Sequence, residues 1–275
     1  MRKEIQPFYS HALQREMPVH IYGHAGKPIL YIPCQDGRAW DFESFHMTDT
    51  LAPWIERGEC VVWSVDTVDA ESWSDAGGDP WWRIRRHEAW VQYLVRELAP
   101  FILSRSKEGT GDADCRDQCA HWSRNDRTGE LAREAGAGIM TFGCSLGGGH
   151  ALNLYLRFPE VFDRCLALSG MYHASYFFGD YMDELVYQNS PADYMANMPP
   201  DHPFIEKYRQ NRAVLCTGQG PWEEPWSPRA MDQRFRELGI PAWVDYWGWD
   251  VSHDWPWWYR QAAYFLPYLL NERTE

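Results

Sequence analysis

The chain has 275 residues, of which 45% are hydrophobic, and its formal net charge is −13 at neutral pH. A chain of this length can bury a central sheet within one domain, so we expect residues 1–275 to fold as a single unit. The acidic balance argues against nucleic acid or an anionic membrane as the main partner.

Short apolar runs alternate with helical patterns along the chain. Strands are predicted over residues 18–22, 29–32, 60–65, 138–142, 165–168, 213–217 and 242–247. Helices are predicted over 84–98 and 231–238, where apolar side chains recur on one face, and from about residue 257 to 270. Gly239 would end the second helix. The alternation predicts an α/β fold in which helices cover both faces of a mostly parallel sheet.

Two segments interrupt this alternation. Residues 107–136 are rich in Gly, Asp, Arg and Cys without a sustained apolar period, which predicts a surface insertion. Residues 171–210 are crowded with aromatic side chains and lie between two predicted core strands. They would emerge at the edge where open α/β sheets bind ligands, so we predict a cap over the binding site. The alternative is a helical excursion that packs on the sheet away from the substrate.

The seven cysteines favour a reducing compartment, because several fall in strand-like runs where they would be buried. The first residues have no signal-peptide core and no stretch is apolar enough to span a membrane, so we expect a soluble, cytoplasmic protein. Cys115, Cys119 and His121 could contribute to a metal site. No second ligand pair with zinc-like spacing accompanies them, and we therefore expect no metal.

A strand that ends in Gly-Cys-Ser-Leu-Gly at 143–147, with a helical pattern after it, is typical of a nucleophile elbow. The serine at the apex must adopt a strained backbone, and the flanking Gly143 and Gly147 remove side chains that would collide there. This predicts Ser145 as the nucleophile and the Leu146 amide as an oxyanion donor. Cys144 is the rival nucleophile, but it should point away from the binding site and serve in packing.

A serine nucleophile needs a base, which this arrangement supplies downstream as a histidine. Three histidines are considered: His173, His202 and His253. His253 stands between the last predicted strand and the last predicted helix, which is where the base is expected. His150 is expected to be a packing or surface residue of the helix after Ser145.

The acid should follow the strand over 213–217 and accept the Nδ1 proton of His253. Glu223 is our choice in the loop that follows, and Glu224 stays open as the alternative. Asp250 and Asp254 are too near His253 in sequence to be its natural partner from a different strand.

The segments 36–38 (Asp-Gly-Arg), 143–152 and 252–258 (Ser-His-Asp-Trp-Pro-Trp-Trp) give the chain a resemblance to the putative-esterase branch of the α/β-hydrolases. This group includes esterase D-like enzymes, feruloyl-type carbohydrate esterases and mycolyltransferases. The resemblance implies an α/β-hydrolase fold, a Ser–acid–His triad and no metal or organic cofactor. It also implies that the Arg38 amide is the second oxyanion donor, as after the Asp-Gly pair of the mycolyltransferases.

The chain departs from the family pattern in lacking a His-Gly-Gly run and in having a longer acid loop. We predict hydrolysis of a carboxylic ester through an acyl-enzyme on Ser145. Acyl transfer to an alcohol and a non-catalytic scaffold that binds a ligand or partner are the alternatives. Trp40 and Trp222, with Trp73 and Trp226, suggest a small-molecule substrate with an apolar or planar portion. The acyl group, the alcohol and the oligomeric state are left open by the sequence.

Overall fold

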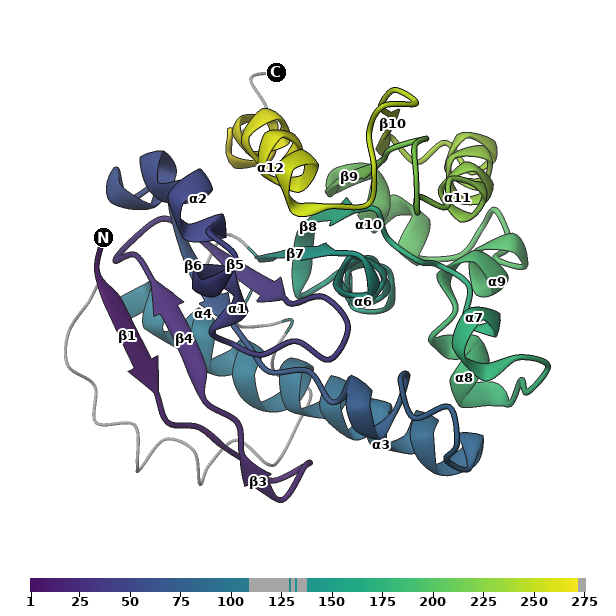
Figure 1. Cartoon of the computed structure of the whole chain (residues 1–275), viewed down its shortest axis with the longest axis horizontal. Coiled ribbons are helices and arrows are strands. Elements are labelled where there is room, and N and C mark those ends of the chain that lie inside the picture. The colour runs from purple at the N-terminus through teal and green to yellow at the C-terminus, as the bar shows by residue number, and fades with distance from the viewer. Residues whose placement is uncertain (109–128, 130–131, 133–137, 272–275) are drawn as a thin grey trace.

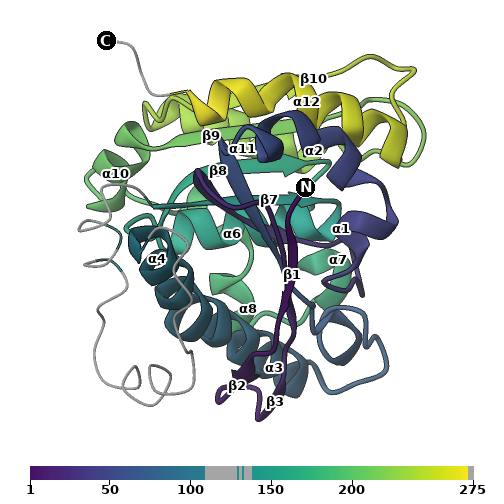
Figure 2. The same ribbon diagram turned by 90° about the vertical axis from the view of Figure 1, so that its left-hand side faces the viewer.

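A central sheet of eight strands, shown in Figures 1 and 2, organises the computed structural model, which describes residues 1–108, 129, 132 and 138–271. The strand order is β1-β4-β6-β5-β7-β8-β9-β10, and all neighbours from β6 to β10 are parallel. In this sheet, β4 runs antiparallel to both of its neighbours, β1 and β6. The strands of this sheet are β1 (Lys3–Gln6), β4 (Val19–Tyr22), β5 (Lys27–Ile32), β6 (Cys60–Ser64), β7 (Ile139–Cys144), β8 (Phe162–Leu168), β9 (Arg212–Thr217) and β10 (Trp243–Tyr246), and β2 (Tyr9–Ser10) pairs with β3 (Arg15–Glu16) outside it.

Helices cover both faces of this sheet, as Figures 1 and 2 both show. One face carries α2 and α12, and the other carries α3, α4 and α6. The helical elements are α1 (Asp41–Ser44), α2 (Met47–Glu56), the 3₁₀ turn η1 (Asp69–Glu71), α3 (Pro80–Gln92), the π-helical turns η2 (Tyr93–Leu98), α4 (Ala99–Glu108), α6 (Leu146–Arg157), α7 (Ser175–Phe178), α8 (Glu184–Gln188), α9 (Pro191–Ala196), α10 (Phe204–Gln210), α11 (Trp226–Glu237) and α12 (Trp255–Leu270).

The alternation of side chains along the strands explains the two layers of core. In β8, Cys165 and Ala167 belong to the core on the α6 face, whereas Leu166 and Leu168 belong to the core on the α12 face. Successive side chains of a strand point to opposite faces, so an apolar run of this kind must be buried on both sides. The predicted α/β fold with helices on both faces is confirmed.

All seven predicted strands are present, with ends displaced by up to three residues, as in β8. The sequence did not predict β1, because Lys3–Gln6 is a polar edge strand whose side chains are exposed or half-buried in alternation. The helix predicted over 84–98 is longer than expected, since α3 continues through η2 into α4.

Most of the insertion predicted over 107–136, including Cys115, Cys119 and His121, lies outside the described residues. Within the described part of the chain, no group of three or more His, Cys, Asp or Glu side chains is arranged to hold a metal ion. None of the described helices is both long and apolar enough to cross a bilayer.

The segment over 171–210 forms four short helices, α7 to α10. Helix α9 packs on α6 and α11, and α8 packs on α3, so much of the segment lies on the helical layer. Its beginning reaches the elbow, because Ala174 and Phe178 share a small apolar cluster with Leu146 and Trp73. Whether it closes over a substrate stays a prediction.

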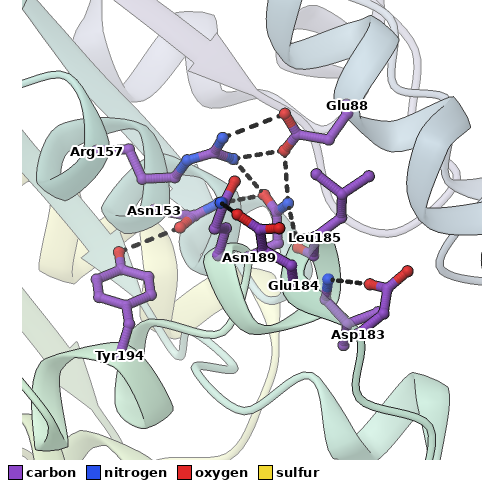
Figure 3. Close-up of polar contacts among 10 residues, drawn as sticks. Glu88, Asn153, Arg157, Asp183, Glu184, Leu185, Asn189 and Tyr194 are labelled. Carbon is purple, nitrogen blue, oxygen red and sulfur yellow. Dashed lines mark hydrogen bonds and ion pairs between the residues drawn. The ribbon is translucent and has the colours of Figure 1, made fainter.

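A buried polar network holds this segment against α3 and α6, as Figure 3 shows. The Arg157 guanidinium in α6 donates to Glu88 in α3 at 2.6 and 3.2 Å. The Asn189 amide, at the end of α8, donates to the same carboxylate at 2.6 Å and accepts from Asn153 at 2.7 Å. Tyr194 in α9 donates to Asn153 at 3.1 Å. Because each buried polar group has a partner, the network fixes α8 and α9 to the helix that follows Ser145.

Candidate active site

Ser145 stands at a sharp corner between β7 and α6, with φ 58° and ψ −130°. Such a backbone is costly for a residue other than glycine and persists only where the surroundings enforce it. A Cβ at Gly143 would lie 2.1 Å from the Gly147 oxygen, and one at Gly147 would lie 2.2 Å from the Pro33 oxygen. The two glycines therefore allow three backbone segments to touch at the corner, which matches the reason predicted for them.

His253 lies on the loop between β10 and α12 and meets the serine directly. Its Nε2 is 2.9 Å from the Ser145 Oγ. The backbone amide of His253 donates to the Pro221 oxygen at 3.1 Å, and its ring makes an edge contact with Trp258 at 5.0 Å between centroids. The imidazole is thus held from two sides with one nitrogen facing the serine.

Glu223 faces the other nitrogen of His253, with Oε2 at 3.4 Å from Nδ1. Its other oxygen, Oε1, accepts from the Ser169 hydroxyl at 2.7 Å and from the Gly218 amide at 3.1 Å. The Thr217 hydroxyl donates to Oε2 at 3.2 Å. Burial raises the pKa of Glu223, but the hydrogen bonds from His253 and Ser169 outweigh it and leave the pKa lowered. The Glu223 side chain is only 1% exposed. Because its pKa is lowered, this buried carboxylate is ionised at neutral pH and faces the imidazole.

The loops that carry Glu223 and His253 are joined by their backbones. The Gly220 amide donates to the Val251 oxygen at 2.9 Å, and the Gln219 amide donates to the Gly248 oxygen at 3.2 Å. A Cβ at Gly220 would lie 2.6 Å from the same Val251 oxygen, so glycine is required for this approach. The carboxylate and the imidazole are consequently positioned as one unit.

Glu224, the alternative acid, does not face His253. Its carboxylate accepts from the Trp226 amide at 3.1 Å and from the Ser227 hydroxyl at 3.2 Å. These groups lie in the first turn of α11, where a carboxylate satisfies unpaired amides and interacts favourably with the helix dipole. The structure therefore separates the two glutamates and places only Glu223 beside the imidazole.

The lowered pKa of Glu223 predicts a pH-dependent contribution to stability. A carboxylate whose folded pKa is below its ordinary value of 4.5 stabilises the fold above that value and loses this contribution as the pH falls through the folded pKa. We expect Glu223→Gln to lower the free energy of unfolding at neutral pH and the gap from wild type to shrink below about pH 4.5. Urea unfolding across this range measures the gap. The exposed Glu206→Gln is the control, and a gap that stays constant or widens in acid would contradict the assignment.

The other candidates for nucleophile and base are placed elsewhere. Cys144 is fully buried, and burial raises the pKa of its thiol well above the ordinary value, so it is inert packing. His150 is buried and lies 3.0 Å from the Asp69 carboxylate. His173 stacks on Trp226 at 4.4 Å, and His202 accepts from the backbone amide two residues later. The expectation that Cys144 and His150 serve in packing agrees with these contacts.

The oxyanion assignment to Arg38 requires a correction. Its backbone amide donates to the Asp41 carboxylate at 2.9 Å, so it cannot also donate to an oxyanion, and the carboxylate would repel one. The amides of residues 36, 37 and 39 are also engaged. Among the amides of residues 34–39, which the structure describes in full, only Cys34 and Gln35 lack a partner, and the Leu146 amide is free in the same way.

Of the four tryptophans suggested as contacts for the substrate, three are exposed and one is buried. Trp40 and Trp222 are exposed, Trp222 by 89% and with a strained φ of 66° directly before Glu223. Trp226 is also exposed. Trp73 is buried and packs against His150, so it is a core residue and does not belong to a substrate surface.

Comparisons with known proteins bear on the fold and on the family. The family profile described as "Putative esterase" matches residues 129–263, which include Ser145, Glu223 and His253. The chain is therefore similar to the putative-esterase family over this segment. The resemblance inferred from the motifs is thereby confirmed, and this match supports an ester hydrolase.

Solved structures are similar to this chain over nearly its whole length. A ferulic acid esterase is 16% identical with a TM-score of 0.68, and the alignment covers 98% of both chains. An S-formylglutathione hydrolase from Agrobacterium tumefaciens is 14% identical with a TM-score of 0.64, covering 98% of this chain and 94% of that one. MPT51 from Mycobacterium tuberculosis is 14% identical with a TM-score of 0.62, covering 98% of both. At these identities the likeness shows the α/β-hydrolase fold.

No curated protein matches this chain by sequence at a significant level.

Two residues of the site were missed by sequence reasoning. Ser169 follows β8 and hydrogen bonds to Glu223, and Asp69 contacts His150. Neither stands in a recognisable motif, although the end of a parallel strand next to the elbow is a position where a polar residue is expected to take part in the site.

Proposed function

We propose that the chain is a serine hydrolase that cleaves a small-molecule carboxylic ester through an acyl-enzyme on Ser145. The observation that carries the proposal is the continuous series of contacts from Ser145 Oγ to His253 Nε2 and from His253 Nδ1 to Glu223. This is the arrangement that activates a hydroxyl of ordinary pKa, with the carboxylate fixing the imidazole tautomer.

The proposed reaction uses these three side chains and water. Ser145 Oγ attacks the ester carbonyl carbon while His253 Nε2 takes the hydroxyl proton. The tetrahedral intermediate collapses, and His253 returns the proton to the leaving alcohol. A water molecule then attacks the acyl carbon and gives a proton to His253. The second tetrahedral intermediate collapses, His253 returns this proton to Ser145 Oγ, and the carboxylic acid is released. Glu223 stays ionised throughout and stabilises the imidazolium.

The oxyanion of each intermediate would be bound by the backbone amides of Leu146 and Gln35. Leu146 follows the nucleophile at the beginning of α6, where the amides have no partner within the helix. Gln35 lies two residues beyond Pro33, whose oxygen a Cβ at Gly147 would approach within 2.2 Å. The β5 loop therefore passes directly beside the elbow, which supports the Gln35 amide in place of that of Arg38.

The surroundings support a neutral substrate with an apolar or planar portion. Trp222 precedes Glu223 and is almost fully exposed, and Trp40 is half-exposed on the loop after β5. Exposed indole rings of this kind offer flat apolar contact area to a substrate. The net charge of −13 disfavours an anionic substrate.

A panel of p-nitrophenyl and aryl esters of increasing acyl length tests the proposal together with a fluorophosphonate probe. We expect hydrolysis of at least part of the panel, a single probe adduct on Ser145, and loss of hydrolysis in proportion to labelling. Folded protein that neither reacts with the probe nor hydrolyses any ester would favour the non-catalytic scaffold. Dominant acyl transfer to an added alcohol would identify a transferase instead.

A further inference from the structure

The turn that carries Gln35 is held by a carboxylate from another part of the chain. The Gly37 amide donates to the Cys34 oxygen at 2.9 Å and closes a four-residue turn. Asp36, its third residue, has a φ of 59°, whereas Gln35 is not in the left-handed region, which is the pattern of a type II turn. The Asp36 amide belongs to the central peptide of this turn and donates to Asp69 Oδ2 at 3.3 Å. Asp69 therefore opposes a flip of that peptide.

The other oxygen of Asp69 reaches the helix that follows the nucleophile. Its Oδ1 lies 3.0 Å from His150 Nε2, and His150 is in the second turn of α6. The side chains of Asp69 and His150 are only 1% and 3% exposed. Three aromatic rings pack around His150: His87 is stacked on it at 4.9 Å, Trp90 lies at 5.3 Å, and Trp73 makes an edge contact at 5.4 Å. A buried carboxylate with both oxygens hydrogen bonded is a rigid connection.

We infer that Asp69 is a positioning residue that sets the separation of the two proposed oxyanion donors, the Gln35 and Leu146 amides, an inference that rests on the proposed function. One oxygen of Asp69 binds the turn on the Gln35 side, and the other binds α6, which begins at Leu146. Oxyanion donors contribute to catalysis only when they are held in place before the charge develops. The Gln35 side chain, which donates to the Ser74 hydroxyl at 2.8 Å, anchors the same turn to the segment that follows Asp69.

The test compares Asp69→Ala with Asp69→Asn. Alanine removes both acceptors, whereas asparagine keeps an oxygen for the Asp36 amide and an NH₂ group that can donate to His150 in its other tautomer. With active sites counted by the fluorophosphonate probe, we expect Asp69→Ala to lower kcat about 10- to 100-fold and to change KM less than about threefold. Asp69→Asn should stay within about threefold of wild type in kcat. The inhibition constant of an arylboronic acid, a mimic of the tetrahedral intermediate, should rise by the factor by which kcat falls.

Tyr208→Phe is the matched control, because it removes a buried hydrogen bond to the Leu156 oxygen at the opposite end of α6. It should leave kcat and boronate inhibition unchanged. If Asp69→Ala does not fold, Asp69→Ser is tested in its place, because the serine hydroxyl is too short to reach the Asp36 amide. The inference is overturned if kcat per counted site stays within about twofold of wild type, or if Tyr208→Phe shows the same fall. A wild-type protein that hydrolyses no ester and takes no probe would instead overturn the proposed function.

Discussion

Ser145→Ala is expected to lower kcat/KM for a susceptible ester by about 10⁴- to 10⁶-fold. The variant keeps the imidazole, the carboxylate and the backbone amides, but no atom remains at 2.9 Å from His253 Nε2 to attack the carbonyl. His253→Gln should cause a loss of similar size, because without a base the serine hydroxyl stays protonated. Residues that act as one unit are not additive, so the double variant should be little worse than either single variant.

Initial rates with an aryl ester and intact-protein mass after fluorophosphonate treatment measure both effects. Cys144→Ala is the control, since its thiol is buried and inert although it neighbours the nucleophile. Cys144→Ala should keep kcat/KM within a few-fold of wild type, because the substitution leaves only a small cavity. If Ser145→Ala kept a tenth or more of the wild-type rate, the nucleophile would have to be another group and the acyl-enzyme on Ser145 would be refuted.

The sheet and the elbow could be predicted because their residues are constrained locally. The strands β7 and β8 are apolar on both faces, and such a run has few other stable arrangements. The glycines on each side of Ser145 are required by contacts within a few residues and with the neighbouring strand, so they leave a readable motif. His253 was chosen from its order along the chain, and its Nε2 lies 2.9 Å from the Ser145 Oγ. The edge strand β1 was missed, because a polar strand paired on one side only has no apolar pattern.

The second oxyanion donor could not be read from the sequence for a physical reason. Every residue except proline carries a backbone amide, so the donor is chosen by the fold and not by the side chain. Arg38 was excluded only when Asp41 proved to accept its amide hydrogen. Asp69 was equally hidden, since it meets the β5 turn and α6 from a separate segment.

The choice between Glu223 and Glu224 was also beyond the sequence, because adjacent glutamates have the same chemistry and differ only in direction. We expect Glu223→Gln to lower kcat by about 10³- to 10⁴-fold with little change in KM, and Glu224→Gln to lower it less than about threefold. Glu224 accepts hydrogen bonds from the first turn of α11, so the main effect of its substitution should be on stability.

The size of the Glu223→Gln effect follows from the donors around the carboxylate. Ser169 and the Gly218 amide both donate to Oε1, so the oxygen of a glutamine would occupy that position. Its NH₂ group would then face His253 Nδ1 and donate to it, which places the ring proton on Nε2. In that tautomer the imidazole cannot accept the Ser145 proton.

Nitrogen NMR of labelled histidine measures this tautomer directly, alongside kcat for both variants. Ser169→Ala with Glu223→Gln removes one of the two donors at Oε1 and should let the amide rotate, restoring part of the lost rate. A Glu223→Gln variant that keeps the wild-type tautomer and rate, or a Glu224→Gln variant that loses both, would reverse the assignment of the acid. The hydrogen bonds to Oε1 therefore orient the side chain at position 223, and this orientation decides which tautomer His253 adopts.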